Sequence, residues 1–397
     1  MAPTDTQLTP VPMLDVLGVP MLDVNRQNGP LQEELSAALA AVCASGAFVN
    51  GPAVKQFEEE MARYCGTRHA IGCASGSDAL LLALMALGIG PGDEVIVPSF
   101  TFFATASSVT RLGATPVFTD IVPETFNVDP GDIARKITPR TKAIMPVHLF
   151  GQCANMGAIN TLAREAGRIP VIEDAAQAIG AEFEHRRAGS LGRMGCFSFY
   201  PTKNLGGLGD GGLITTDNTE LADKLRILRD HGQHPRYYHH EVGINSRLDA
   251  LQAAALSVKL PRLDSYAAGR QKNAQAYARE FARTGLDSRI AIPTVKPGCA
   301  SVWNQFTVRV RDGERDNLQK HLAERKIGAA VYYPVPLHLQ KCFAFLGHHE
   351  GSLPVTELAC REVLSLPIYE CLTTDEQTQV IGAIAEYFGF AANRQAA

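Results

Sequence analysis

One lysine of this sequence, Lys203, lies where covalent chemistry is possible. It falls between an apolar segment and a glycine-dense turn in the stretch Cys196–Gly212, which reads CFSFYPTKNLGGLGDGG. An amine that is partly withdrawn from water loses some of its preference for the charged form, so a neutral, nucleophilic fraction can attack a carbonyl. Most isolated lysines are solvated surface residues, so the prediction for Lys203 depends on the residues that accompany it.

Two groups of small residues are candidates for holding a phosphate. Ser75, Gly76 and Ser77 lie where a loop is expected to become the N-terminus of a helix, and free backbone amides and the helix dipole favour an anion there. Ser198, shortly before Lys203, could give a hydroxyl to the same phosphate. Taken alone, the first group is more often a helix cap, and a strand serine more often bonds a neighbouring backbone group.

An acidic residue and an aromatic residue complete the set. Asp174 closes the predicted strand PVIED, where a carboxylate can hold the ring nitrogen of a heteroaromatic cofactor protonated. Phe102 follows another predicted strand, where its ring could stack on that cofactor. A helix N-cap and a core phenylalanine are the ordinary alternatives. Together with Lys203 and the phosphate residues, however, the set matches the needs of pyridoxal 5'-phosphate.

Strands and helices alternate along the chain before these residues and between them. The predicted strands lie at 94–99, 115–120, 142–147, 170–174, 195–200 and 212–216, and the predicted helices at 31–42, 79–87, 156–166 and 248–281. This alternation predicts an α/β fold with a mostly parallel sheet covered by helices on both faces. Ligands of such sheets bind beyond the carboxyl ends of the strands.

The pattern changes in the last third of the sequence. The segments VWNQFTVRV and AAVYY, a helix near 318–324 and two later helices predict a smaller α+β domain. We therefore expect an N-terminal extension at 1–24, a large cofactor-binding domain at 25–260 and a small C-terminal domain at 261–397.

Composition excludes several other classes of protein. The net charge of -4 provides no basic surface for nucleic acid, and no apolar run approaches the roughly 20 residues that span a bilayer. Nine cysteines without a Cys-x-x-Cys pair indicate reduced thiols and a cytoplasmic location. No metal site is expected, because the adjacent histidines 239–240 and 348–349 lack a cysteine partner at ligand spacing.

The motifs also carry a family resemblance that runs nearly end to end. The chain resembles the DegT/StrS-type nucleotide-sugar aminotransferases, a branch of the fold-type I pyridoxal phosphate enzymes. The matching stretches are FVNGPAVKQFEEEMARYCG, CASGSDALLLAL, DEVIVPSFTFFAT, VHLFGQ, IEDAAQAIGA, CFSFYPTKNLGGLGDGG, GINSRLDALQAA and YYPVPLHLQ.

The resemblance implies a role for each site residue. Lys203 would form the internal Schiff base, Asp174 would bind the pyridine nitrogen, Phe102 would stack on the ring and Gln177 would contact the phenolic oxygen. The remaining implied residues are Gly76, Ser77 and Ser198 at the phosphate, Asn245 at the same phosphate from a neighbouring subunit, and Arg247 and His338 at the substrate. A homodimer with shared active sites follows from the role of Asn245.

The same resemblance implies a reaction. The enzyme would transfer an amino group from L-glutamate to a nucleotide-linked ketosugar by a ping-pong Schiff-base mechanism. The stretch GINSRLDALQAA resembles the branch that acts on 3-keto sugars, such as UDP-2-acetamido-3-keto-glucuronate or a dTDP-3-keto-6-deoxyhexose. Members that act at C4 read closer to GYKYNMTDIQAA.

A 4-ketosugar aminotransferase and a non-catalytic regulatory protein on the same fold are the main alternatives. A related dehydratase branch carries histidine where this chain has Lys203. A dinucleotide-binding oxidoreductase is disfavoured because the glycine-rich run 207–212 follows Lys203 and does not open a helix after a first strand.

Overall fold

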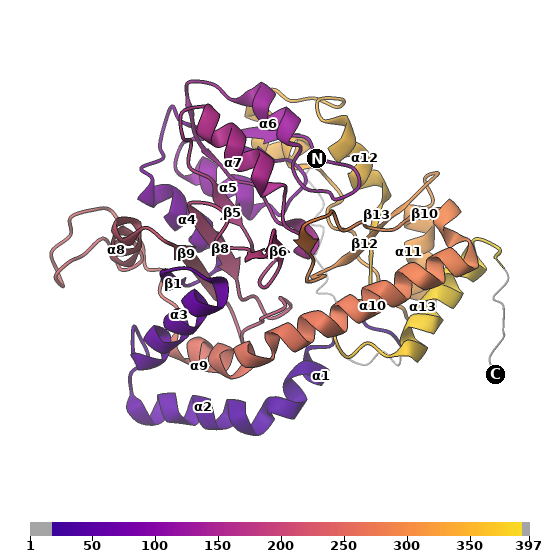
Figure 1. Cartoon of the computed structure of the whole chain (residues 1–397), viewed down its shortest axis with the longest axis horizontal. Helices are drawn as coiled ribbons and strands as arrows, with labels where there is room; N and C mark the ends of the chain where they lie inside the picture. Colours follow the sequence, from indigo (N-terminus) through magenta and orange to yellow (C-terminus); the bar gives the residue numbers. More distant parts are fainter. Residues whose placement is uncertain (1–17, 391–397) are drawn as a thin grey trace, which may run out of the picture.

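A computed structural model of the chain describes residues 18–390 (Figure 1). The α-helices are α1 Val24–Asn28, α2 Gln32–Ser45, α3 Pro52–Cys65, α4 Gly76–Ala86, α5 Ala104–Arg111, α6 Pro130–Lys136, α7 Met156–Glu165, α8 Thr219–Leu228, α9 Ala250–Lys259, α10 Leu263–Thr284, α11 Arg315–Glu324, α12 Pro354–Glu362 and α13 Thr374–Tyr387. The strands are β1 His69–Cys73, β2 Glu94–Pro98, β3 Thr115–Thr119, β4 Thr141–Ile144, β5 Ile172–Asp174, β6 Glu182–Phe183, β7 Arg186–Arg187, β8 Met194–Ser198, β9 Gly212–Thr216, β10 Ile290–Ala291, β11 Cys299–Ala300, β12 Phe306–Val310 and β13 Val363–Leu366.

The central sheet is built from two ladders, β1-β9-β8-β5 and β3-β2-β4. Parallel bridges between Ile144 and Val171 and between Val147 and Asp174 join β4 to β5, so the two ladders form one continuous sheet. The β5–β8, β2–β3 and β2–β4 pairs are parallel, while β9 runs antiparallel to both β1 and β8. The mostly parallel sheet predicted from the sequence is therefore confirmed.

Helices cover both faces of this sheet. In β2, Val95 and Val97 are buried in a cluster with residues of α4, α5 and α8, whereas Ile96 is buried in a second cluster with residues of α3, α7 and α9. Successive strand residues point to opposite faces, so this split is what a buried strand between two helix layers requires. It also explains why the three central residues of the strand, Val95–Val97, are all apolar rather than alternating.

The predicted helix at 248–281 is interrupted. α9 ends at Lys259, the 3-10 turn Leu260–Arg262 follows, and α10 then continues over 22 residues. Pro261 lies in this turn, and a proline lacks the backbone N–H that an uninterrupted helix needs. The expected domain boundary at 260/261 coincides with this turn in the sequence and stays a prediction.

The C-terminal third forms its own core. β10, β12 and β13 make an antiparallel sheet, and a third buried cluster combines it with residues of α10, α11 and α13. Figure 1 shows α10 running from beside α9 towards α11 and α13. Of the predicted segments, VWNQFTVRV contains β12, but AAVYY forms no strand and contributes one bridge, Ala330 to Ser365. Pro334 directly follows that segment and has no N–H to donate to a neighbouring strand.

Most of the expected N-terminal extension at 1–24 lies outside the described residues. Val19, however, pairs with Ile327 and is buried in the C-terminal cluster. Within 18–390, none of the helices is long and apolar enough to cross a membrane.

Candidate active site

Two predicted site residues close neighbouring parallel strands. Asp174 ends β5 and Ser198 ends β8, and the two strands pair in parallel with Asp174 opposite Cys196. The carboxyl ends of parallel strands meet at one edge of a sheet. The topology therefore places the acid and the serine at the same edge, and the Lys203 loop begins there.

The Asp174 carboxylate is buried and held by two donors. Its Oδ2 accepts a hydrogen bond of 2.8 Å from Thr105 Oγ1, and its Oδ1 accepts one of 3.3 Å from the Ala176 N–H. Burial raises the pKa of Asp174, while Thr105, Ala176 and the positive charge of Lys203 oppose the shift. No basic side chain in the described part of the chain forms an ion pair with it, so it keeps acceptor capacity for a further N–H.

Lys203 lies in the turn after β8, where its backbone N–H donates to the Tyr200 carbonyl at 2.8 Å. The side chain is partly exposed, but burial around its amine lowers the pKa to about 8, and the negative charge of Asp174 opposes this shift. The charge of each group shifts the pKa of the other, so the two side chains interact electrostatically. A substantial neutral fraction of the amine near neutral pH is what a nucleophile or base requires.

Buried polar side chains hold the backbone of the turn that carries Lys203. Lys259 Nζ, which is fully buried, donates to the Gly206 carbonyl at 2.6 Å. Asn204 Nδ2 donates to the Val302 carbonyl at 2.8 Å. Lys259 was not predicted as a site residue from the sequence, because a lysine on an amphipathic helix usually faces solvent.

The predicted phosphate site is a close contact between α4 and the sheet. A Cβ on Gly76 would come within 2.6 Å of the Ser198 Cβ, and a Cβ on Gly212 would come within 2.3 Å of the Ser75 carbonyl oxygen. Ser75 caps α4 by accepting from the Asp78 N–H at 3.1 Å. The helix N-terminus thus meets the Ser198 hydroxyl, and the amides of Gly76 and Ser77 are by position without an intrahelical acceptor.

An aromatic wall lies at the same edge. Phe102 is 59% exposed, and its ring centroid is 6.4 Å from that of Tyr333. Gln177 Nε2 donates to the Tyr333 hydroxyl at 3.3 Å, and Gln177 Oε1 accepts from the Phe150 N–H at 2.7 Å. Thr105 and Tyr333 were not predicted as site residues, although they lie within the matching stretches DEVIVPSFTFFAT and YYPVPLHLQ, respectively.

Asn245 and Arg247 lie on a segment that is anchored to α4. Between them, Ser246 Oγ donates to Asp78 Oδ2 at 2.8 Å and accepts from the Ala74 N–H at 3.2 Å. The Asn245 side chain is exposed, and Arg247 forms an ion pair of 2.5 Å with Asp230. Among residues 18–390, neither side chain forms a hydrogen bond or an ion pair with Lys203 or Asp174.

His338 is buried, and its ring does not face solvent at the site. It is 1% exposed, its Nδ1 lies 2.7 Å from Ser99 Oγ, and its Nε2 lies 3.2 Å from Glu357 Oε1. Burial lowers its pKa, while Glu357 opposes the shift. Both ring nitrogens are occupied, so this geometry gives the predicted substrate role no support.

The residues present fit pyridoxal 5'-phosphate. A helix N-terminus with two free amides beside Ser198, a buried carboxylate with free acceptor capacity and a lysine with a lowered pKa are the three groups that this cofactor needs. Among residues 18–390, no cluster of three or more His, Cys, Asp or Glu side chains is arranged to hold a metal ion.

Comparison with known proteins agrees with this site. The model of the DegT/DnrJ/EryC1/StrS aminotransferase family matches residues 30–385. A "pleiotropic regulatory protein" of Geobacillus stearothermophilus is 49% identical, over 94% of this chain and 99% of the relative. A dTDP-3-amino-3,4,6-trideoxy-alpha-D-glucose transaminase of Streptomyces venezuelae is 46% identical, over 93% of this chain and 96% of the relative.

Solved structures extend the comparison to the fold. DesV of Streptomyces venezuelae, in complex with a ketimine intermediate, superposes with a TM-score of 0.90 at 44% identity and covers 96% of this chain and 100% of its own. Other similar structures hold the cofactor in its pyridoxal or pyridoxamine form. The chain therefore belongs to the DegT/DnrJ/EryC1/StrS aminotransferase family and is a pyridoxal phosphate-dependent aminotransferase with a fold of type I.

Proposed function

We propose that this enzyme transfers an amino group from L-glutamate to C3 of a nucleotide-linked 3-keto sugar, in two half-reactions that use one site in turn. The observation that supports the proposal is the buried Asp174 carboxylate, whose charge acts on the Lys203 amine, at the sheet edge where the N-terminus of α4 meets Ser198. The 3-keto assignment is supported by the NSRLD stretch and by the name of the Streptomyces transaminase, which refers to a 3-amino sugar.

Bound pyridoxal 5'-phosphate supplies an electron sink that stabilises negative charge at the donor carbon. Ser198 and the amides of Gly76 and Ser77 would hold its phosphate, and Asp174 would accept the ring N–H and keep that proton in place. Lys203 Nζ would take the proton from the α-carbon of the amino donor. Phe102 would cover one face of the ring and so restrict its movement.

The covalent role of Lys203 has a direct test. Wild-type protein should show a visible absorption band that disappears on borohydride reduction, with the cofactor mass then found on the peptide that contains Lys203. Lys203→Ala protein should retain no reducible link. Cofactor that stays covalently attached to the Lys203→Ala protein would refute the assignment.

We also propose that two subunits share each active site. Phe48, Val49 and Leu208 are large apolar side chains that stay exposed, and their backbone is fixed to the start of α9: the Ala250 N–H donates to the Phe48 carbonyl, and Gln252 Oε1 accepts from the Leu208 N–H. Apolar side chains that gather on one rigid surface favour a protein partner. A second copy seated there would explain why Asn245, on the neighbouring anchored segment, faces outwards.

Mixed dimers test this arrangement. Lys203→Ala and Asn245→Ala subunits are each expected to be nearly inactive alone. If Asn245 acts across the interface, a hybrid dimer contains one complete site, so an equal mixture after subunit exchange should regain about a quarter of wild-type activity, since half of the dimers are hybrids with one active site of two. Activity that stays at the level of the parents would place Asn245 in its own subunit's site.

The sugar is tested by offering UDP- and dTDP-linked 3-keto and 4-keto sugars with L-glutamate and locating the new amine by NMR. We expect amination at C3 and release of the keto acid before the ketosugar binds. Faster turnover of a 4-keto sugar would overturn the C3 proposal. The 4-keto alternative and the 3-keto proposal use the same cofactor residues, so the absorption test above does not depend on this result.

A purely regulatory role is disfavoured on chemical grounds, although one relative carries a regulatory name. A descendant without turnover would have no chemical need for Lys203, Asp174 and Gln177 together. We retain the cytoplasmic location as part of the proposal, because all nine cysteines are free.

A further inference from the structure

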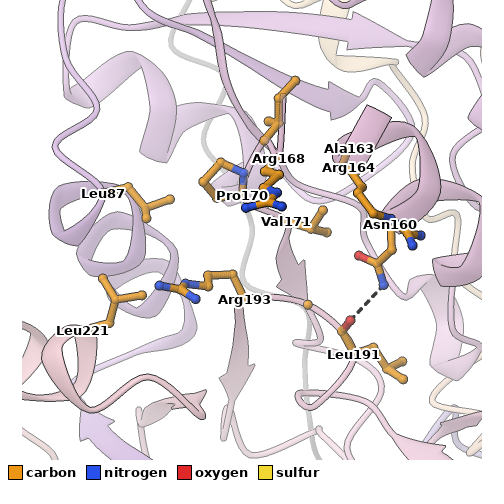
Figure 2. A pocket seen from close by; sticks show the side chains of 12 residues that line it. Leu87, Asn160, Ala163, Arg164, Arg168, Pro170, Val171, Leu191, Arg193 and Leu221 are labelled. Atoms are coloured by element: carbon orange, nitrogen blue, oxygen red, sulfur yellow. Dashed lines mark hydrogen bonds between the residues drawn. The ribbon is translucent and has the colours of Figure 1, made fainter. Parts of the chain in front are cut away.

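A cavity of about 600 Å³ opens at the opposite edge of the central sheet from the active site (Figure 2). Val171, which precedes β5, and Arg193, which precedes β8, line it. Asp174 and Ser198 lie at the other ends of the same two strands. Since β8 has five residues, Arg193 and Ser198 are separated by about 16 Å along the strand, at roughly 3.3 Å per residue. The cavity is thus distinct from the cofactor site.

Three arginines, Arg164, Arg168 and Arg193, stand around this cavity. Figure 2 shows Arg193 extending towards Leu221, with Arg164 on the other side beside Asn160. None of the three guanidinium groups forms an ion pair with a carboxylate of residues 18–390. All three side chains are exposed around one cavity, and guanidinium groups without carboxylate partners are free to bind an anion there.

Helix geometry accounts for only one of these residues. Arg164 lies in the last turn of α7, where a cation is favoured by the helix dipole, and it also donates to Thr161. Arg168 lies beyond the helix at φ +63°, a left-handed conformation that residues other than glycine rarely adopt. Arg193 lies outside any helix, before β8. The helix dipole accounts for neither Arg168 nor Arg193, so these two arginines support the presence of a ligand.

The remaining lining is largely apolar. Leu87 at the end of α4, Leu221 in α8 and Pro170 lie beside the guanidinium groups (Figure 2). A volume of this size falls in the range of pockets that hold small molecules. Guanidinium groups bind phosphate oxygens in a bidentate manner, and an apolar wall suits a flat ring.

We propose that this cavity is a second binding site, separate from catalysis, for an anion that carries a diphosphate and a ring of nucleotide size. The diphosphate would bind to Arg168 and Arg193, and the ring would lie against Leu87 and Leu221. Free nucleotides and nucleotide-linked sugars share this chemistry. The proposal does not depend on which sugar the enzyme aminates.

Inorganic pyrophosphate is the first probe. Its binding to cofactor-loaded protein is measured by calorimetry, and hydrogen exchange locates the protected backbone. We expect protection at 160–171 and at 191–193, and an affinity that falls at least tenfold in the double variant Arg168→Gln/Arg193→Gln. The double variant Lys272→Gln/Arg279→Gln, which removes two exposed cations of α10, is the matched control for net charge and should bind as wild type does.

The outcomes separate the possibilities. Unchanged affinity in a double variant that melts as wild type does, or protection only around 75–77 and 198, would overturn the proposal, since the second result assigns the binding to the active site. An equal loss in Lys272→Gln/Arg279→Gln would show a general charge effect and would also overturn it. UDP and dTDP should bind more tightly than pyrophosphate. Binding of pyrophosphate without binding of either nucleotide would show that the apolar wall does not accept a base, and would overturn the proposal of a nucleotide-sized ligand.

Discussion

The pKa of Lys203 is the quantity on which the catalytic assignment most depends. Burial lowers it from 10.5 to about 8. At pH 7.5 an amine with a pKa of about 8 is neutral in roughly a quarter of molecules, against about one in a thousand for an ordinary lysine, a difference on the order of 200-fold. In cofactor-free protein, Lys203 should therefore react with an amine-specific reagent far faster than a solvated lysine does.

Competitive labelling followed by mass spectrometry measures this pKa at each lysine in one sample. Lys259 is a built-in control, because burial also lowers its pKa to about 8 but its side chain is fully buried. Lys259 should remain unlabelled, which would show that labelling requires an amine that is accessible as well as neutral. Asp174→Asn should lower the pKa of Lys203 further, because the Asp174 charge now raises it. A Lys203 pKa near 10.5, or one that rises in Asp174→Asn, would refute the reasoning.

Three further substitutions test the surrounding groups. Thr105→Val removes a hydrogen bond that lowers the pKa of Asp174, so the acid limb of the pH–rate profile should move to higher pH; an unmoved limb would contradict this role. Phe102→Ala should weaken cofactor binding about fivefold, or about 1 kcal/mol by fluorescence titration, and leave unfolding of cofactor-free protein in urea unchanged. Gly76→Ala places a Cβ 2.6 Å from the Ser198 Cβ, so cofactor affinity should fall at least tenfold, and Ser198→Gly in the same protein should restore part of it.

Sequence patterns predicted the parts of the site that depend on strand ends. Asp174 and Ser198 each close an apolar run, and the parallel sheet then brings both to one edge. The contact between Gly76 and Ser198 could not be read from the sequence, because it joins elements that are more than 100 residues apart and depends on how α4 packs on β8. A pattern of small residues indicates that close approach is possible, but it does not name the partner.

Residues that position other residues could not be predicted from the sequence for a related reason. Lys259 belongs to a helix whose apolar pattern is ordinary, and only the fold shows its amine turned inwards to the Gly206 carbonyl. His338 illustrates the reverse case. A histidine in a motif suggested substrate contact, whereas the fold encloses it between Ser99 and Glu357. Side-chain direction at these positions is set by tertiary packing, which periodicity along the chain does not encode.

In cofactor-free protein, the burial of Asp174 and Lys203 is expected to lower folding stability near neutral pH. Burial raises the pKa of Asp174, so as the pH rises towards neutral the folded state must lose a proton that the unfolded state has already lost, and stability falls. Burial lowers the pKa of Lys203 to about 8, so between about 8 and 10.5 the unfolded state holds more protons and stability rises with pH, which means that a penalty is present below 8. Both groups are therefore unfavourable near neutral pH, and their mutual attraction offsets only part of this. A ligand that donates an N–H to Asp174 and bonds covalently to Lys203 would remove both penalties at once, so the same pair that makes the site reactive also favours the loaded protein over the empty one.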